Sequence, residues 1–316
     1  MVCVIFNTGA NLGPKKMFEI LTHDILPVFS VMVLGFVMGR RKFVSHAEAA
    51  TLNRIAFLIL QPALIFPLVN SVDLSEFYFD AIALYAIGQA IVFVLALAVG
   101  VFILKCELAE AWLLAMATVF VNSLLYIWPI SSLIYGNDGN LPITAIVVWD
   151  ATFTFAFFII TTDLLVNKGQ SAIQSLARLL KNPVLIAIFL GLCTNVFGII
   201  APEPILVASK FAGAGAAPLT LFALGVILSG HQMFPTKKMT VIALIKLCLL
   251  PIVVALLLQL GNRPLIWNEL LLLNAAGPSG AMAFALAMLY KVRTDTIAPV
   301  IIWTSILTLV LLAWLA

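Results

Sequence analysis

The chain has 316 residues, of which 63% are hydrophobic and 10% are charged, and its mean hydropathy is +1.16. Roughly one quarter of the residues of a soluble domain are charged, so this composition excludes a soluble globular protein and predicts an integral membrane protein. The formal net charge is +3, but the basic residues lie in short turns rather than on one exposed surface, so nucleic acid is not an expected partner.

Apolar segments of membrane-spanning length follow one another along the whole chain. A helix needs about 20 mostly apolar residues to cross roughly 30 Å of hydrocarbon. In chain order, ten such helices are predicted near residues 24–40, 52–70, 81–104, 111–135, 142–166, 182–201, 211–231, 239–260, 268–290 and 296–315. The expected fold class is therefore an all-α integral membrane protein embedded in the lipid bilayer.

The polar residues 1–16 precede the first apolar segment. They lack the apolar core and the small-residue cleavage pattern of a signal peptide, so they are expected to form an N-terminal extension that is not cleaved. Met17 opens an apolar stretch that runs directly into the first helix. It is an alternative start of translation, in which case residues 1–16 are not part of the protein.

The first half of the chain recurs in the second half. The residues that recur in the same order, at an offset of 156 (183 minus 27), are Pro27 and Pro183, Gly35 and Gly191, Pro62 and Pro218, and Phe66 and Phe222. Two five-helix halves are therefore expected, at residues 17–167 and 182–316, joined by a linker at residues 168–181. Because five is odd, the second half enters the membrane from the opposite side, which gives the inverted repeat typical of secondary transporters.

The distribution of basic residues predicts the orientation in the membrane. Most of them lie in the loops after predicted helices 1, 3, 5, 7 and 9. Loops rich in Lys and Arg face the cytoplasm. We therefore expect a multi-pass protein of the cell (inner) membrane, with the linker and these loops in the cytoplasm and both termini outside.

The fourth and ninth predicted helices contain polar residues and helix-breaking signals. The fourth carries Asn122 and Ser123, and the ninth carries Asn274 followed by Gly277, Pro278, Ser279 and Gly280. Proline removes a backbone hydrogen bond and glycine loosens the chain, and Pro278 corresponds to Asn122 at the 156-residue offset. Two broken helices that cross near the midplane are therefore expected, where inverted-repeat transporters bind their substrates.

These motifs resemble those of the auxin efflux carrier family, over essentially the whole chain from the first helix onward. The marks of the resemblance are Leu52-Asn53, Gln61-Pro62-Ala63-Leu64-Ile65-Phe66, Asn122-Ser123 with Pro129, Asn182-Pro183, Pro218-Leu219 with Leu224-Gly225, Lys246-Leu247 with Leu250-Pro251, and Ala275-Ala276-Gly277-Pro278 with Tyr290.

The resemblance implies ten helices in two inverted halves, a scaffold part and a moving transport part, and a crossover of helices 4 and 9 at the substrate site. It also implies a homodimer built on scaffold helices. The short linker resembles that of the compact bacterial permeases for malonate, malate and similar acids. Plant carriers have proline where this chain has Val121, so the break in helix 4 is less strongly predicted than the break at Pro278.

The residues at the predicted crossover suit a small organic anion. Two half-helix N-termini each present unpaired N–H groups and about half a positive charge, and neutral polar side chains can orient a carboxylate. The substrate-binding candidates are Asn122, Ser123, Asn274, Gly277, Pro278 and Ser279. The alternative is that these groups only cap the broken helices or join neighbouring ones.

Two ionisable residues lie inside predicted helices, Asp150 in the fifth and Lys246 in the eighth. Ionisable groups at such depth are costly and usually functional. Asp150 is a candidate for binding a coupled proton, and Lys246 for pairing with a carboxylate or attracting the substrate. The alternatives are that Asp150 faces an aqueous cavity and that Lys246 snorkels to the cytoplasmic surface.

No cofactor or metal site is predicted, because the three His and four Cys residues show no ligand spacing. The expected coupling ion is H⁺, with Na⁺ as the alternative.

The patterns together predict a secondary active transporter, not an enzyme, that moves a small organic anion such as malonate or malate across the plasma membrane by alternating access. Coupling to protons or to the membrane potential is expected. One alternative is a sodium-coupled organic-anion symporter with the related bile-acid-symporter-like fold. The other is a non-transporting membrane sensor.

Overall fold

The computed structural model describes residues 14–136, 140–166, 181–231, 234–293 and 295–315. Across these residues every regular element is a helix, and a helix satisfies its own backbone hydrogen bonds within hydrocarbon. Among the described residues, seven helical stretches are long and apolar enough to span a membrane: Lys16–Arg40, His46–Asn70, Phe79–Ile103, Leu141–Val166, Glu203–Leu228, Lys237–Leu258 and Ile297–Leu315. The prediction of an all-helical integral membrane protein is confirmed.

Shorter apolar helices occupy the other three predicted spans. The fourth span contains Leu108–Val119 and Ser123–Tyr135, the sixth contains Pro183–Val196, and the ninth begins with Leu265–Ala275. Several boundaries differ from the prediction. The first helix already begins at Pro14, and residues 203–210, where a loop was expected, belong to a helix that begins at Glu203. Residues 1–13 of the predicted extension and residues 168–180 of the predicted linker lie outside the described residues.

The chain forms two compact units, each built from several separate stretches of sequence. Unit 1 comprises Met1–Phe29, Tyr78–Ile146 and His231–Ala316, and unit 2 comprises Ser30–Phe77 and Val147–Gly230. Two helices pass from one unit into the other, α3 (Leu26–Arg40) and α9 (Leu141–Trp149).

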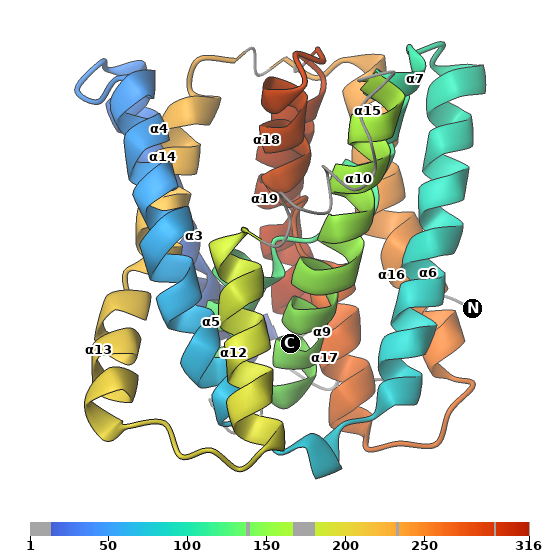
Figure 1. Ribbon diagram of the computed structural model, residues 1–316. Helices are drawn as coiled ribbons and strands as arrows, with labels where there is room; N and C mark the ends of the chain where they lie inside the picture. Colours follow the sequence, from blue (N-terminus) through green and yellow to red (C-terminus); the bar gives the residue numbers. More distant parts are fainter. Residues whose placement is uncertain (1–13, 137–139, 167–180, 232–233, 294, 316) are drawn as a thin grey trace. The chain divides into compact units, whose positions relative to one another are not determined.

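Unit 1 holds the remaining helices of three sequence regions. They are α2 (Pro14–Ile20), η1 (Leu21–Ile25), α6 (Phe79–Ala98), η4 (Val99–Ile103), α7 (Leu108–Val119), η5 (Ser123–Ile127), α8 (Trp128–Tyr135), α15 (Lys237–Leu244), η8 (Ile245–Leu249), α16 (Leu250–Leu258), α17 (Leu265–Ala275), α18 (Met282–Leu289) and α19 (Ile297–Leu315). Within this unit α6 packs against both α7 and α16, and α16 also packs against α17 (Figure 1). Most η segments are π-helical turns, which are frequent at functional sites.

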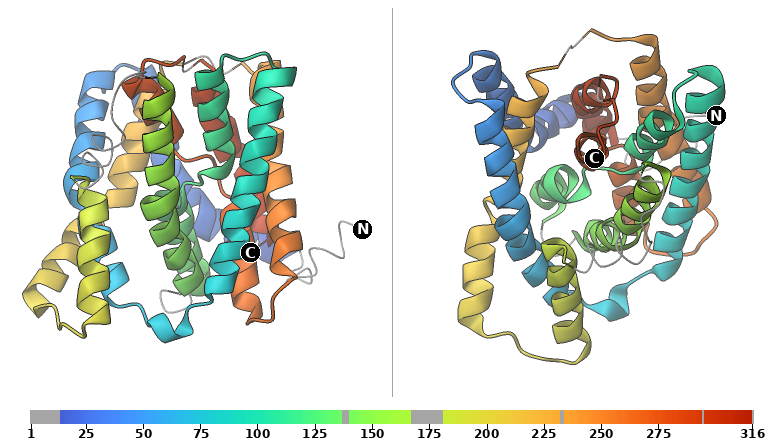
Figure 2. Two further views of the ribbon diagram at one scale, coloured as in Figure 1. Left: turned by 45° about the vertical axis from the view of Figure 1, so that its right-hand side comes forward. Right: turned by 45° about the horizontal axis from the view of Figure 1, so that its top comes forward.

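Unit 2 is built around α5. Its helices are α4 (His46–Ile55), η2 (Ala56–Leu60), α5 (Gln61–Asn70), η3 (Leu74–Glu76), η7 (Asp150–Thr154), α10 (Phe155–Val166), α12 (Pro183–Val196), α13 (Glu203–Gly213) and α14 (Ala216–Leu228). Helix α5 packs against α12 and α13, and α4 packs against α14 (Figure 2). Asn182 caps α12 through its side-chain oxygen, 2.9 Å from the amide nitrogen of Val184, and Pro183 suits the first helical position.

The landmarks of the sequence repeat contact one another in matching pairs within unit 2. A Cβ atom on Gly191 would lie 3.1 Å from the carbonyl oxygen of Phe66, and a Cβ atom on Gly35 would overlap the carbonyl oxygen of Phe222. Gly191 follows Gly35 by 156 residues, and Phe222 follows Phe66 by the same number. Small residues at both contacts let the helix backbones approach closely, as is common in membranes.

Three helix ends carry a lysine in the left-handed conformation that usually selects glycine. Lys42, Lys105 and Lys291 have φ angles of 61°, 52° and 55°. Lys42 follows α3, where its amide bonds to the carbonyl of Gly39 and the next amide bonds to the carbonyl of Met38. This is a Schellman helix end. A left-handed residue with a side chain costs about 1–2 kcal/mol relative to a right-handed one.

Candidate functional site

Two apolar helices of unit 1 are interrupted. Helix α7 ends at Val119, the chain is extended at Phe120 (φ −84°, ψ 103°), and helical structure resumes with η5 at Ser123. Helix α17 ends at Ala275, and α18 begins at Met282 (Figure 1). The structure thus places an interruption in each of the two helices in which the sequence contains break signals, although Val121 rather than proline precedes Asn122.

The two interrupted segments cross and pair through their backbones. The amide of Gly280 donates to the carbonyl oxygen of Phe120 at 2.7 Å, and the amide of Asn122 donates to the carbonyl oxygen of Pro278 at 3.1 Å. Val121 and Ser279 form an antiparallel bridge. A buried extended backbone must find such partners because water does not reach it.

Glycine is needed where the two segments approach each other. A Cβ atom on Gly280 would lie 2.9 Å from the Phe120 ring and 3.1 Å from the Phe120 carbonyl oxygen. A Cβ atom on Gly277 would lie 2.6 Å from the Cδ1 atom of Ile127 and 2.8 Å from the Cγ1 atom of Val121. A side chain at Gly280 would force the two backbones apart, whereas one at Gly277 would force the side chains of Ile127 and Val121 to shift.

Side chains from neighbouring helices cap the C-terminal ends of both interrupted helices. The last carbonyl of α7, that of Val119, accepts a hydrogen bond from the Gln89 amide at 3.1 Å. The last carbonyl of α17, that of Ala275, accepts one from the Lys246 ammonium group at 2.7 Å. The negative end of a helix dipole favours a cation. Lys246 is 0% exposed, so it does not snorkel to an aqueous surface.

Within the part of the chain that the structure describes, the helices that follow the two interruptions, η5 and α18, have N-terminal ends without such side-chain caps. Among the described residues no side chain caps η5 at Asn122 or α18 at Ala281. The first N–H groups of a helix have no partner within it. Each of these two ends therefore presents free N–H groups and the positive end of a helix dipole.

Buried polar atoms without partners surround these two helix starts. Within the described ranges, no hydrogen bond is made by the hydroxyl oxygens of Ser123, Tyr126 and Ser279 or by the side-chain oxygen of Asn274. A buried polar atom left unpaired costs about 1–3 kcal/mol, and such atoms in a native structure often mark the place of a ligand or water.

The backbone around these atoms is held by residues that the sequence patterns did not single out. Tyr85 accepts from the Asn274 amide at 2.8 Å, and Thr304 accepts from the Ser279 amide at 3.2 Å. Thr308 donates to the carbonyl of Ala276. A sequence signal was present, because Gln89, Thr304 and Thr308 are polar residues within long apolar helices.

The structure brings most of the predicted site residues together. Asn122, Ser123, Asn274, Gly277, Pro278 and Ser279 all belong to the crossing segments or to the last turn of α17, and Lys246 caps that same turn. Asp150 belongs to unit 2, where it opens η7 and is 3% exposed. Asp163, on α10 of the same unit, is equally buried and was not predicted as a candidate.

The described residues contain no group of three or more His, Cys, Asp or Glu side chains that could hold a metal ion. In unit 1, the buried Glu110 carboxylate accepts hydrogen bonds from Lys238 and Thr296 at 3.5 Å each. Burial raises the pKa of the nearby Cys106 thiol. One acid and one base at this separation form an ion pair rather than a metal site.

Comparison with known proteins indicates a membrane transport protein. The family described as membrane transport protein matches residues 20–315. A Rhizobium meliloti protein named "Putative malonate transporter" is 26% identical over 304 residues, which cover 91% of this chain and 92% of that protein. An uncharacterized transporter of Methanothermobacter thermautotrophicus is 24% identical over 298 residues, covering 92% and 95%. An uncharacterized transporter of Methanocaldococcus jannaschii is 22% identical, covering 92% and 96%.

The chain belongs to this membrane transport family, the auxin efflux carrier family whose motifs it resembles. It is a multi-pass membrane protein of a transporter family and not of an enzyme family. The sequence-based identification of the family is confirmed.

Proposed function

We propose that this protein is a secondary active transporter that moves a small organic anion, such as malonate or malate, across the plasma membrane by alternating access. The observation that carries the proposal is the pair of uncapped helix N-termini at η5 and α18, surrounded by unpaired hydroxyl groups of Ser123 and Ser279. N–H groups and hydroxyls can all donate to a carboxylate.

A dicarboxylate suits this arrangement because it has two anionic ends and the site has two helix N-termini. One carboxylate would accept from the first N–H groups of η5 and from Ser123, and the other from those of α18 and from Ser279. Neutral donors and dipoles hold an anion without a fixed ion pair, which lets it leave again. The name of the Rhizobium meliloti relative agrees with this choice of substrate.

Asn274 would add specificity. Its amide bonds to the Tyr85 hydroxyl at 2.8 Å and its oxygen is unpaired. Rotation of the side-chain amide exchanges the positions of its N–H donors and its oxygen acceptor. The Tyr85 hydroxyl can follow this change, because a hydroxyl can either accept or donate. Asn274 can therefore offer an acceptor to the malate hydroxyl or to a cation, or a donor to a carboxylate.

The proposed architecture is ten membrane helices in two inverted halves. The contacts of Gly35 with Phe222 and of Gly191 with Phe66 support it, because a two-fold relation between the halves pairs residues in this reciprocal way. The bond between Asn122 and Pro278 supports it as well, because these residues correspond at the 156-residue offset and lie where the two-fold axis would pass. We assign the moving part to unit 1, which contains the crossing, and the scaffold part to unit 2.

The first prediction concerns the two serines. Replacing both, as Ser123→Ala with Ser279→Ala, removes two donors and is expected to lower malonate uptake by roughly 10-fold or more, at about 1 kcal/mol for each lost hydrogen bond. The measurement is uptake of radiolabelled malonate and malate into proteoliposomes. The variant should be no less stable to thermal unfolding than the wild type, because neither hydroxyl has a partner in the described structure.

The matched control is Ser305→Ala. Ser305 is also buried in unit 1, but its hydroxyl donates to the carbonyl of Ile301 in its own helix at 2.8 Å. Malonate uptake by the Ser305→Ala variant should stay near that of the wild type. Equal uptake by the double serine variant and by the control would remove the crossing from the proposed substrate site.

The second prediction concerns coupling. Asp150→Asn is expected to abolish the stimulation of uptake by an imposed proton gradient and to leave downhill flux, because an amide cannot exchange the proton. The measurement compares uptake with and without the gradient. Asp163→Asn is the control, since Asp163 is a second buried aspartate of unit 2. Loss of proton coupling in Asp163→Asn but not in Asp150→Asn would assign the coupling role to Asp163.

Sodium coupling is the competing mechanism. A sodium site needs several oxygen ligands, and the unpaired oxygens of Ser123, Asn274 and Ser279 could contribute some of them. Uptake that requires Na⁺ at fixed pH and fixed membrane potential would favour this alternative. No uptake of either acid by folded protein, whatever the ion, would refute the proposed substrates.

A further inference from the structure

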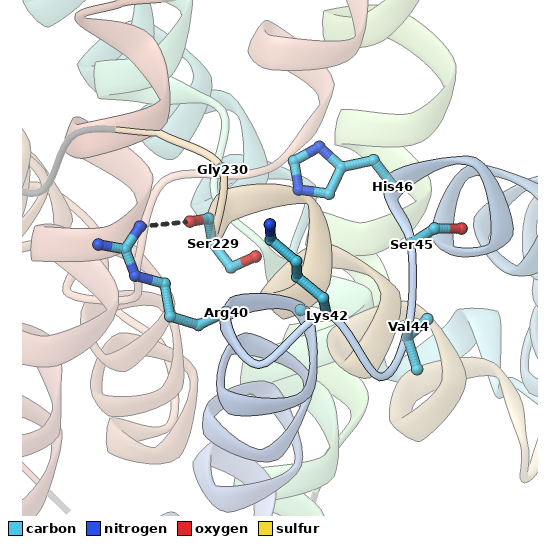
Figure 3. Close-up of a pocket in the computed structure, with 8 residues that line it drawn as sticks. Arg40, Lys42, Val44, Ser45, His46, Ser229 and Gly230 are labelled. Atoms are coloured by element: carbon cyan, nitrogen blue, oxygen red, sulfur yellow. Dashed lines mark hydrogen bonds between the residues drawn. The ribbon is translucent and has the colours of Figure 1, made fainter.

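A basic pocket lies in unit 2. It has a volume of about 370 Å³ and is lined by Gly39, Arg40, Lys42, Val44, Ser45, His46, Ser229 and Gly230. These residues come from the end of α3, the start of α4 and the end of α14 (Figure 3). The volume falls at the lower end of the roughly 300–1,000 Å³ found for small-ligand pockets.

The charge of this pocket is positive. Arg40 and Lys42 are positively charged side chains, and the His46 ring lies beside them. Among the described residues that line it, none is acidic. The nearby Glu48 carboxylate is occupied by the capping box of α4, where it accepts from the Ser45 amide at 2.8 Å and from the Ser45 hydroxyl at 2.7 Å. The N-terminus of α4 adds the positive end of its dipole.

The backbone fixes where these groups lie. Lys42 occupies the left-handed position that ends α3, with a φ of 61°. The Arg40 guanidinium donates to the carbonyl oxygen of Ser229 at 3.5 Å. A Cβ atom on Gly230 would overlap the His46 ring, so glycine is required for the ring to lie there. Figure 3 shows Lys42 and His46 extending toward the same opening beside Ser229.

We propose that this pocket binds a phosphate group, namely the anionic headgroup of a membrane phospholipid. Arginine and lysine are the residues that bind phosphate most often, and basic pockets between membrane helices on the cytoplasmic side bind anionic headgroups. The arginine-, lysine- and histidine-lined end of α3 belongs to a loop that the distribution of basic residues places on that side.

Exposed apolar side chains on α3 and beside Lys42 favour a lipid over a soluble phosphate. Leu34 and Val37 on α3 are exposed by 53% and 46%, and Phe43 beside the pocket is 75% exposed. Exposed apolar side chains on the helix that ends at a basic pocket, and on the residue after Lys42, match a molecule with a phosphate head and acyl chains. A free phosphate ion would gain nothing from them.

The test is a lipid titration of the purified full chain by native mass spectrometry, with phosphatidylglycerol as the anionic probe and phosphatidylcholine as the neutral one. Wild-type protein should retain phosphatidylglycerol preferentially. A basic residue near anionic lipid contributes enough for about a five-fold change in affinity, so Lys42→Gln should bind phosphatidylglycerol about five-fold more weakly, and Lys42→Arg should bind normally.

The matched control is Lys105→Gln. Lys105 is also an exposed lysine with a positive φ after a helix, but it does not line the pocket. Equal retention of phosphatidylglycerol by Lys42→Gln and Lys105→Gln, or no preference of the wild type over phosphatidylcholine, would overturn the proposal. Thermal unfolding of each variant shows whether the compared proteins are equally folded.

A second arm separates the lipid from free phosphate. Inorganic phosphate is added to protein in phosphatidylcholine alone, and stabilisation against thermal unfolding is measured. Stabilisation only by phosphatidylglycerol, sensitive to Lys42→Gln, supports the lipid headgroup. Equal stabilisation by inorganic phosphate without any preference for phosphatidylglycerol would overturn the lipid as the occupant.

Discussion

Lys246→Gln is expected to produce a folded protein that transports its anion poorly. Glutamine can still donate to the Ala275 carbonyl, as Gln89 does to the Val119 carbonyl at the end of α7, so the end of α17 stays capped. The positive charge beside the crossing is lost. The bond expected to be lost is the one between the ammonium group and the substrate carboxylate. A hydrogen bond to a charged group contributes about 1.5–3 kcal/mol, so malonate uptake should fall by roughly 10- to 150-fold.

Two measurements separate charge from capping at Lys246. Thermal unfolding should place Lys246→Gln close to wild type, whereas Lys246→Met, which leaves the Ala275 carbonyl without this donor, should be less stable by about 1–3 kcal/mol. Gln89→Met is the matched variant at the other helix end and should lose stability without the same loss of charge-dependent uptake. Wild-type uptake by Lys246→Gln would show that only the cap matters.

Gly280→Ala is expected to abolish transport. The added methyl group would meet the Phe120 ring at 2.9 Å and two backbone oxygens at 3.1 and 3.2 Å. The backbone cannot turn aside as a long side chain can, so the crossing segments must separate and weaken the 2.7 Å hydrogen bond between Gly280 and Phe120. Overpacking of this kind costs about 1–3 kcal/mol, which should appear as a lower unfolding temperature together with the loss of malonate uptake.

Gly215→Ala is the control for Gly280→Ala. A Cβ atom at Gly215 would meet its nearest neighbours at 3.5 and 3.6 Å, which is ordinary contact. This variant should fold and transport like the wild type. A fully active Gly280→Ala protein would mean that the crossing is loose enough to accept a side chain, and the geometry proposed for the site would be wrong.

The sequence predicted features that depend on local chemistry. A membrane protein followed from the hydropathy, and the interruption around Pro278 followed from glycine and proline inside an apolar span. Other features depend on contacts between distant residues. Val121 has no intrinsic tendency to end a helix, and the segment around it is extended because Phe120 and Asn122 bond to Gly280 and Pro278.

The caps at the C-terminal ends of the broken helices could not be predicted for the same reason. Nothing in the sequence around Lys246 indicates that its ammonium group bonds to the Ala275 carbonyl. Most of helix α13 was missed because charged Glu203 and Lys210 interrupt an apolar pattern, although the prolines around Glu203 suit the first turn of a helix.

The three lysines at positive φ have opposite effects on the stability of the folded protein and on its insertion into the membrane. In the folded state, glycine at Lys42, Lys105 or Lys291 would relieve about 1–2 kcal/mol of conformational cost at each helix end. The positive charge acts earlier: it sets the orientation of the helices while they enter the bilayer, before any of these turns has formed. Stabilising the finished protein by Lys→Gly changes at these three ends would therefore remove part of the signal that orients the nascent chain, so higher thermal stability would come with a larger fraction of wrongly inserted protein.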